Sequence, residues 1–321
     1  MIRAPALRGR PGSSSGAAAS GASLLDPETL TRIGGLELVA RHVVQGFLTG
    51  LHRSSRRGFS TEFDQFRPYT PGDDLKHVDW KIFARTDRYF VKEYEADRNL
   101  ETCLLLDTSG SMGFQGGGVG KFRFAAMLAV SLAYLLLRQR DRVGLCLMGD
   151  RGPAAIPMGC RPGQLTRIVS LLEGVRPQGN ANLGRELEAL LRRQRRAGLV
   201  VVISDLYDTP EALGNGLALL RQAGHEVLVF HLLDAQEVEF PFHGPLEFVD
   251  METGESRAVD ASQAREDYRY QLKRFLESTE DLCAARGASY LRLDTAASLV
   301  VPLTVFLAAR AAGQRVAIPW R

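Results

Sequence analysis

From Thr102 onward, short β-rich runs alternate with longer runs of helical periodicity, and this alternation limits the possible folds more than any other feature of the chain. The strand-like runs are Thr102–Leu106, Val143–Leu147, Leu199–Ile203, Glu226–Leu233 and Ser289–Leu293. They are apolar throughout rather than at every second position, so both faces of the sheet should be covered. We therefore predict an α/β domain whose doubly wound, mostly parallel sheet is flanked by helices.

Helices are expected between these strands. Apolar residues recur at helical spacing in Lys121–Arg138, Gln164–Leu172, Gly184–Arg196, Pro210–Ala223 and Ala296–Ala312. An insertion at about residues 237–258 interrupts the alternation, and its Glu252-Thr253-Gly254 turn indicates a hairpin of two short strands. A long helix is then expected over residues 263–286, and the whole α/β domain over residues 100–312.

The chain before this domain has parts of different composition. Residues 1–25 are rich in Arg, Gly, Ser, Ala and Pro and contain no acid, so we expect a disordered tail. Apolar residues at helical spacing predict a helix from Leu36 to Leu51. The segment that follows, to Leu100, carries many aromatic residues and is too apolar for a linker. We therefore predict an N-terminal helix and a small β-rich subdomain within residues 36–99.

Composition argues against several classes of protein. With 40 Lys and Arg against 37 Asp and Glu, the net charge is only +3, so we expect no nucleic-acid partner. The four cysteines form no CxxC pair, which argues against a disulfide scaffold or zinc site and favours a cytoplasmic location. The longest apolar run, Phe124–Leu137, has 14 residues. A membrane span needs about 20, so none is expected.

The most informative segment is Leu104–Met112, where an apolar strand ends in Asp107 and the hydroxyl residues Ser109 and Ser111 follow. Ligands of parallel sheets bind at the carboxyl ends of the strands, so these side chains should lie together. Their oxygens suit a hard cation, Mg2+ or Mn2+. A second acid, Asp205, follows another apolar run. If the two strands are neighbours, the carboxylates repel unless a cation lies between them, although either acid could instead cap a turn.

This spacing, followed by a helix and later by Ile203-Ser204-Asp205, resembles the metal-ion-dependent adhesion site of von Willebrand factor A-type domains. The resemblance implies that Ser109 and Ser111 bind the metal directly. It also implies that Asp107 and Asp205 support the metal directly or through water, and that an acidic side chain of a partner fills the last position. We therefore predict a metal site formed by Asp107, Ser109, Ser111 and Asp205.

The third loop of the site departs from the family pattern. The family often shows Gly-Gly-Thr-Asp-Leu there, with the threonine as a metal ligand, whereas this chain has Gly179-Asn180-Ala181-Asn182-Leu183. Ala181 therefore stands at the threonine position and offers no ligand. An amide oxygen of Asn180 or Asn182, or a water molecule, could take its place.

Further segments resemble one bacterial branch of uncharacterised proteins with this domain, many of them encoded beside MoxR-type AAA+ ATPases. These segments are Arg57–Phe63, Arg67–Asp74, Val78–Lys81, Phe240–Phe242, Glu252–Gly254 and Phe306–Arg310. The resemblance covers roughly residues 36–312. It implies an accessory or scaffold for an ATPase-driven chaperone.

Enzyme functions are less well supported. The run Gly116–Lys121 is close to a phosphate loop, but Gln115 and Phe122 stand where a glycine and a Ser or Thr are required. A metal-dependent hydrolase needs a general base, and the sequence places none beside the predicted metal. We therefore predict a non-enzymatic, divalent-metal-dependent protein-interaction module. A metal-free scaffold, suggested by Ala181, and less favourably a hydrolase remain as alternatives.

Overall fold

The computed structural model describes residues 35–54, 65–68, 90–93, 101–149, 154–194 and 196–312. The chain divides into two compact units, one of Met1–Phe47 with Leu100–Arg321 and one of Leu48–Asn99. The tail predicted at residues 1–25 and most of the predicted β-rich subdomain lie outside the described residues. In the smaller unit, β1 (Gln65–Pro68) pairs antiparallel with β2 (Phe90–Glu93).

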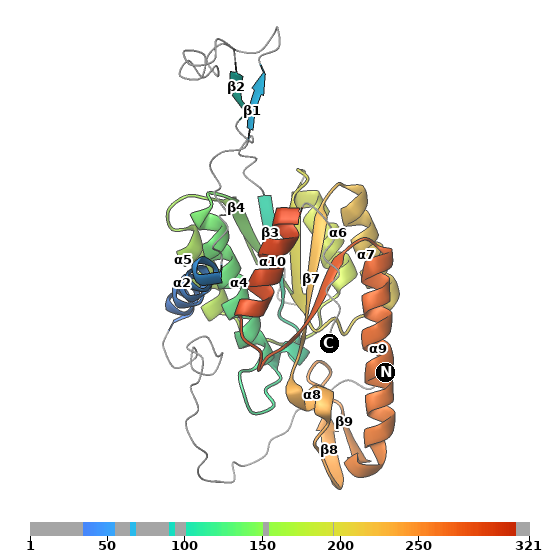
Figure 1. Cartoon of the computed structure of the whole chain (residues 1–321). Coiled ribbons are helices and arrows are strands. Elements are labelled where there is room, and N and C mark those ends of the chain that lie inside the picture. Colours follow the sequence, from blue (N-terminus) through green and yellow to red (C-terminus); the bar gives the residue numbers. More distant parts are fainter. Residues whose placement is uncertain are drawn as a thin grey trace. The chain divides into compact units, whose positions relative to one another are not determined.

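A six-stranded sheet forms the centre of the larger unit, in the order β10-β7-β6-β3-β4-β5 (Figure 1). The strands are β3 (Glu101–Asp107), β4 (Arg142–Met148), β5 (Ala155–Gly159), β6 (Leu199–Ser204), β7 (Glu226–Leu233) and β10 (Ser289–Asp294). All neighbours are parallel except β4 and β5, so the prediction of a doubly wound, mostly parallel sheet is confirmed. The chain winds in opposite directions from β3 and β6, and ligand sites of such sheets lie at this switch point.

The edge strand β5 was not predicted from the sequence. It contains Pro157, which lacks an N–H and is tolerated in sheets mainly at edges. Its residues are exposed or half-buried, and β5 runs antiparallel to β4. The apolar runs that predicted the other strands reflect burial on both faces, which an edge strand does not require.

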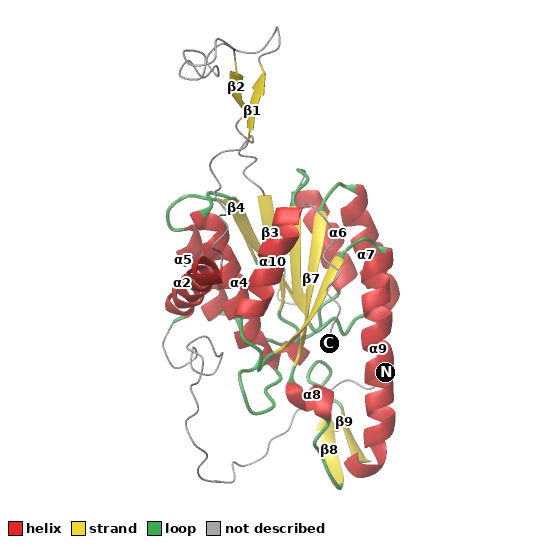
Figure 2. Ribbon diagram, in the orientation of Figure 1, coloured by secondary structure: helices red, strands yellow, loops and turns green. Residues whose placement is uncertain are grey.

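Helices cover both faces of the sheet (Figure 2). They are α2 (Leu36–Ser54), α4 (Lys121–Arg138), α5 (Gln164–Glu173), α6 (Leu183–Arg193), α7 (Pro210–Gln222), α9 (Ala261–Ala285) and α10 (Val300–Ala312). Cys103 and Leu105 of β3 share one apolar cluster with α6, α7 and α9. Since successive strand residues face opposite sides, Leu104 and Leu106 point to the other face, where α4 packs against β3 and β4.

The insertion lies beyond the carboxyl ends of the strands (Figure 1). It begins with the short helix α8 (Ala235–Glu239) and continues as an antiparallel hairpin of β8 (Pro245–Val249) and β9 (Ser256–Asp260). This is the hairpin that the Glu252-Thr253-Gly254 turn indicated. Phe240 stacks on both Phe248 and Tyr268, which holds the insertion on α9.

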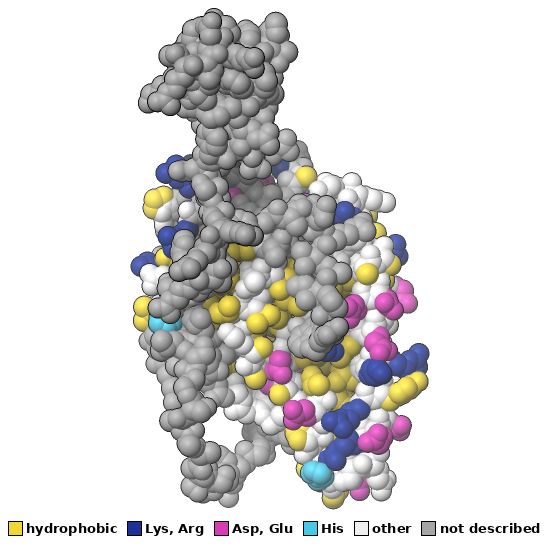
Figure 3. Space-filling model, in the orientation of Figure 1, with side chains coloured by type: hydrophobic (Ala, Val, Ile, Leu, Met, Phe, Trp, Pro, Cys, Tyr) yellow, Lys and Arg dark blue, Asp and Glu magenta, His cyan; other side chains and the backbone are white. Residues whose placement is uncertain are grey.

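Charged side chains of both signs are interspersed on the side of the molecule where α9 lies (Figure 3). One exposed pair there is Lys273 with Glu277, separated by 3.8 Å. Among the described residues, no helix has both the length and the hydrophobicity that a membrane span requires.

Candidate metal site at the carboxyl ends of β3 and β6

The carboxyl end of β3 gathers the first part of the predicted site. Asp107 is the last residue of the strand, and its buried carboxylate accepts hydrogen bonds from the Ser109 N–H at 2.8 Å and the Ser204 hydroxyl at 2.5 Å. The hydroxyl oxygens of Ser109 and Ser111 are 3.0 Å apart. The structure thus brings Asp107, Ser109 and Ser111 together, and it adds Ser204, a residue that sequence reasoning did not single out.

The spacing of the two hydroxyls suits a small divalent cation. Mg2+ binds oxygen octahedrally at about 2.0–2.1 Å, which places adjacent ligands about 3.0 Å apart. Ser109 and Ser111 already have this separation, at which their hydroxyls also form a hydrogen bond. Ser109 is buried and Ser111 half-buried, so a partner could approach from the side of Ser111. The residues present therefore fit a hard cation.

The carboxylate of Asp107 lies in an unfavourable electrostatic environment. Burial raises the pKa of Asp107 from 3.8 to about 6, and the nearby charge of Asp205 raises it as well, while hydrogen bonds from Ser204 and Ser109 lower it. A buried charge is costly unless it is paired. A cation bound beside Asp107 would offset that cost and favour the ionised carboxylate.

Asp205, the second predicted acid, already has a cationic partner. Its Oδ2 accepts a hydrogen bond from Lys121 Nζ at 2.8 Å, and the same ammonium donates to Glu237 Oε1 at 2.7 Å. All three side chains are at most 1% exposed. Burial alone would lower the pKa of Lys121, but the two carboxylates outweigh burial and leave it raised. Burial raises the pKa of Glu237.

Lys121 was noticed in the sequence only as part of the near phosphate loop. The structure places it in the first turn of α4 with its side chain fully buried. The preceding glycine-rich loop packs against α8: the Gly116 N–H donates to Asp234 Oδ2 at 3.0 Å, and a Cβ on Gly116 would lie 2.2 Å from Asp234 Oδ1. The sequence signal that could have marked Lys121 is its place at the start of a mostly apolar helix, although this position does not reveal its partners.

The third predicted loop lies beside the first. The Gly110 N–H donates to the Gly179 carbonyl at 2.8 Å, which joins the two loops through their backbones. Asn182 caps α6, since its side chain accepts a hydrogen bond from the Arg185 N–H at 2.9 Å. Ala181 packs against the apolar cluster beneath. Asn180 lies in the same loop, next to the position where the family has its threonine.

The turn of the insertion hairpin covers the loop between the two serines. A Cβ on Gly110 would lie 2.2 Å from the Met251 carbonyl oxygen, and a Cβ on Gly113 would lie 3.3 Å from Met251 Cε. Only glycine allows the backbone of the turn to approach Gly110 this closely. The insertion therefore forms one wall of the candidate site.

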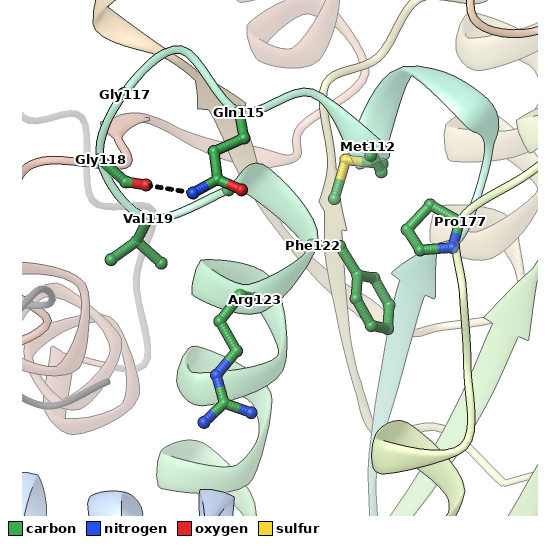
Figure 4. A pocket seen from close by; sticks show the side chains of 10 residues that line it. Met112, Gln115, Gly117, Gly118, Val119, Phe122, Arg123 and Pro177 are labelled. Atoms are coloured by element: carbon green, nitrogen blue, oxygen red, sulfur yellow. Dashed lines mark hydrogen bonds between the residues drawn. The ribbon is translucent and has the colours of Figure 1, made fainter. Parts of the chain in front are cut away.

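An open groove of about 540 Å³ lies beside the glycine-rich loop and the start of α4 (Figure 4). Most of its lining is apolar side chains and glycine backbone, and Gln115 and Arg123 add polar groups. The lining residues are Met112, Gly113, Gln115, Gly117, Gly118, Val119, Gly120, Phe122, Arg123 and Pro177. The Gln115 amide donates to the Gly118 carbonyl at 2.8 Å and braces the glycine-rich loop. The residues that directly follow Ser111 in the chain, Met112 and Gly113, therefore line a concave, largely apolar surface.

The chain is similar to proteins of mycobacteria. Over 298 residues, 90% of this chain and 92% of the relative, the chain is 29% identical to the "Uncharacterized protein Rv1480" of Mycobacterium tuberculosis (strain ATCC 25618 / H37Rv). The same identity and coverage hold for the "Uncharacterized protein Mb1516" of Mycobacterium bovis.

Similar solved structures include the conserved hypothetical protein BatB of Bacteroides thetaiotaomicron, at 16% identity and a TM-score of 0.44, covering 66% of this chain and 99% of that one. The SpRpn10 VWA domain is similar at 12% identity and a TM-score of 0.37, covering 68% of this chain and 99% of that one. The fold assignment rests on the strand order and helices described above. Residues 65–277, more than half of the chain, match the family described as "Protein of unknown function DUF58", and the chain belongs to that family.

Proposed function

We propose that this chain is a non-enzymatic protein-interaction module that binds Mg2+ or Mn2+ at Asp107, Ser109 and Ser111. An acidic side chain of a partner protein completes the coordination. The observation that carries the proposal is the pair of hydroxyls 3.0 Å apart beside a buried carboxylate. Among the described residues, no salt bridge to that carboxylate occurs. All donors of the set are oxygens, which hard cations prefer.

Each residue has a distinct part in this proposal. Ser109 and Ser111 hold the cation directly. Asp107 supplies negative charge, and the Ser204 hydroxyl and the Ser109 N–H keep its carboxylate oriented. The bound cation supplies the positive charge that attracts the carboxylate of a partner. The groove that Met112 and Gly113 line accommodates the apolar side chains that flank this carboxylate.

As the partner we propose a MoxR-type AAA+ ATPase, which this chain would assist in chaperone-like assembly or maturation. The support for this partner is the resemblance of several separate segments, in order, to the branch encoded beside such ATPases. This support is independent of the observations that favour the cation.

A metal-free scaffold is the second candidate function. The observation that favours it is the ammonium of Lys121, which already pairs with Asp205, an acid that the adhesion-site pattern assigns to the metal. Ala181 favours it too, because it leaves the third loop without the usual ligand. A scaffold of this kind binds its partner equally well with and without divalent cations.

The test is binding of a purified MoxR-type ATPase from the same organism, in Mg2+ and in EDTA. Asp107→Ala removes the proposed site, and Glu211→Gln removes an exposed acid at the same edge of the sheet as a matched control. The proposed function predicts binding that EDTA and Asp107→Ala abolish and Glu211→Gln preserves. Equal binding in all samples would favour the scaffold, and no binding in any would contradict the proposed partner.

A further inference from the structure

The buried ion-pair cluster of Lys121, Asp205 and Glu237 has no role in the site proposed above. It contains two carboxylates and one ammonium, which donates at 2.8 Å to the first acid and at 2.7 Å to the second. The rings of Phe114 and Tyr207 lie 5.7 and 5.3 Å from the ammonium and enclose it. Buried charges persist when they are paired and hydrogen-bonded, and here the lysine supplies the pairing.

The ammonium of Lys121 is in direct contact with both carboxylates. It lies within hydrogen-bond distance of two carboxylates, one directly after β6 and one in α8. Its distances of 2.7 and 2.8 Å to the oxygens are only slightly longer than the bonds of about 2.3–2.6 Å that Ca2+ forms. The ammonium of Lys121 therefore already pairs with both carboxylates, Asp205 and Glu237.

The same cluster anchors the insertion. Glu237 also accepts the Asp234 N–H at 2.8 Å in the capping box of α8, and its own carbonyl accepts the Tyr268 hydroxyl at 2.9 Å. From α8 the chain continues into the hairpin whose turn covers Gly110. Lys121 thus links the end of β6 to the segment that forms a wall of the Ser109–Ser111 loop.

We infer that Lys121 is a positioning residue that acts as the built-in cation of Asp205 and Glu237. Because its ammonium already occupies Asp205 and Glu237, a divalent ion can bind only beside Asp107. The same ammonium fixes the insertion against the glycine-rich loop. The effect of Lys121 on a divalent ion rests on the proposed function. Its pairing with Asp205 and Glu237 and its hold on the insertion are independent of that function.

A replacement experiment tests the built-in cation. Asp107→Asn serves as the background, so that the proposed ion site is absent from every sample. Adding Lys121→Ala leaves two buried carboxylates around an ammonium-sized space. We expect millimolar Ca2+ or Mg2+ to raise the melting temperature of this double variant by several degrees relative to EDTA. The Asp107→Asn single variant and the triple variant that adds Asp205→Asn should show no such rise.

If the double variant folds but its melting temperature does not rise with the cation, Lys121 does not act as a built-in cation. A rise in melting temperature that persists when Asp205→Asn is added would contradict the inference as well. A double variant that folds only when the cation is added would support it. If divalent cations do not change the melting temperature of the wild-type protein, only the proposed function is contradicted. The test of Lys121 is unaffected, because all of its samples carry Asp107→Asn.

Hydrogen exchange tests the anchoring of the insertion and does not depend on the lysine variant folding. Glu237→Gln leaves the pair of Lys121 with Asp205 intact but weakens the link to α8. We expect amides of α8 and of the hairpin turn to exchange about tenfold to a hundredfold faster, with β6 unchanged. Glu239→Gln, an exposed acid of the same helix, is the matched control. Unchanged exchange in Glu237→Gln, or exchange that is equally faster in β6, would contradict the inference.

Discussion

Asp107 is the last residue of β3 and Asp205 directly follows the neighbouring parallel strand β6, yet the two acids lie in different electrostatic environments. Asp205 pairs with the buried ammonium of Lys121. Asp107 receives hydrogen bonds from Ser204 and Ser109, and its pKa is raised to about 6. The comparison teaches that an acid at a strand end acquires its role from residues distant in the sequence. Here one acid at the edge is paired with a buried ammonium, and the other has hydrogen bonds but no ion pair among the described residues and suits a bound cation.

Removal of the lysine charge should have the largest effect on stability. Lys121→Met keeps most of the side-chain volume but leaves Asp205 and Glu237 buried without their cation. Breaking a buried ion pair on one side typically costs about 3–5 kcal/mol of unfolding free energy. Urea unfolding at neutral pH in EDTA measures this loss.

The control is a lysine whose ion pair is exposed. Lys273→Met removes the ammonium that lies 3.8 Å from Glu277 on the surface of α9. Pairs of this kind contribute about 0–1 kcal/mol. If the two methionine variants lost similar stability, the buried cluster would not carry the charge balance that we assign to it.

The pH dependence of stability should come from the Asp107 side. The pKa of Asp107 is about 6 in the folded protein and 3.8 ordinarily, so the folded state binds its proton more tightly. The stability from this group is complete below about pH 3.8 and is lost as the pH rises through about 6. The difference corresponds to about 3 kcal/mol, at about 1.4 kcal/mol per pKa unit.

Asp107→Asn should therefore flatten the decline in stability across this window when both proteins are unfolded by urea in EDTA. Glu211→Gln should keep the wild-type slope. If the dependence of unfolding free energy on pH were the same in Asp107→Asn as in the wild-type protein, the charge of Asp107 would already be offset, as that of Asp205 is by Lys121. The contrast between the two acids would then disappear.

Much of the fold could be predicted from the sequence, and so could the grouping of Asp107 with the two serines. The pairing of Asp205 with Lys121 could not. Continuous apolar runs indicated the parallel strands, and the order Asp107, Ser109, Ser111 placed these residues at a strand end. Lys121 could not be assigned to Asp205 and Glu237 because it is 84 and 116 residues away from them. Its partners depend on which strands are neighbours and on where the insertion folds, and local periodicity contains neither fact.

Crowding of the loop between the two serines should have a smaller effect. In Gly110→Ala the new Cβ would lie 2.2 Å from the Met251 carbonyl oxygen, so the hairpin turn must move. We expect a loss of about 1–3 kcal/mol and faster hydrogen exchange in the turn. Gly174→Ala is the control, since its Cβ would meet nothing closer than 3.6 Å. Equal stability of both variants would show that the turn does not press on the loop.

The smallest effect is expected at the third loop. Asn182→Ala removes the side chain that caps α6 and should cost about 1 kcal/mol. If Asn182 only caps the helix, the affinity for Mg2+ stays unchanged, as measured by calorimetric titration. A tenfold weaker affinity would instead assign it the place of the missing threonine. The half-buried cap of α9, in the variant Asp260→Ala, is a control for the loss of stability.

The most direct test of the central claim is calorimetric titration of Mg2+ and Mn2+ into the wild-type protein, Asp107→Ala and Glu211→Gln. We expect a single saturable site in the wild-type protein and in Glu211→Gln, and none in Asp107→Ala. No saturable binding to the wild-type protein at millimolar metal, or binding that survives Asp107→Ala, would contradict the central claim.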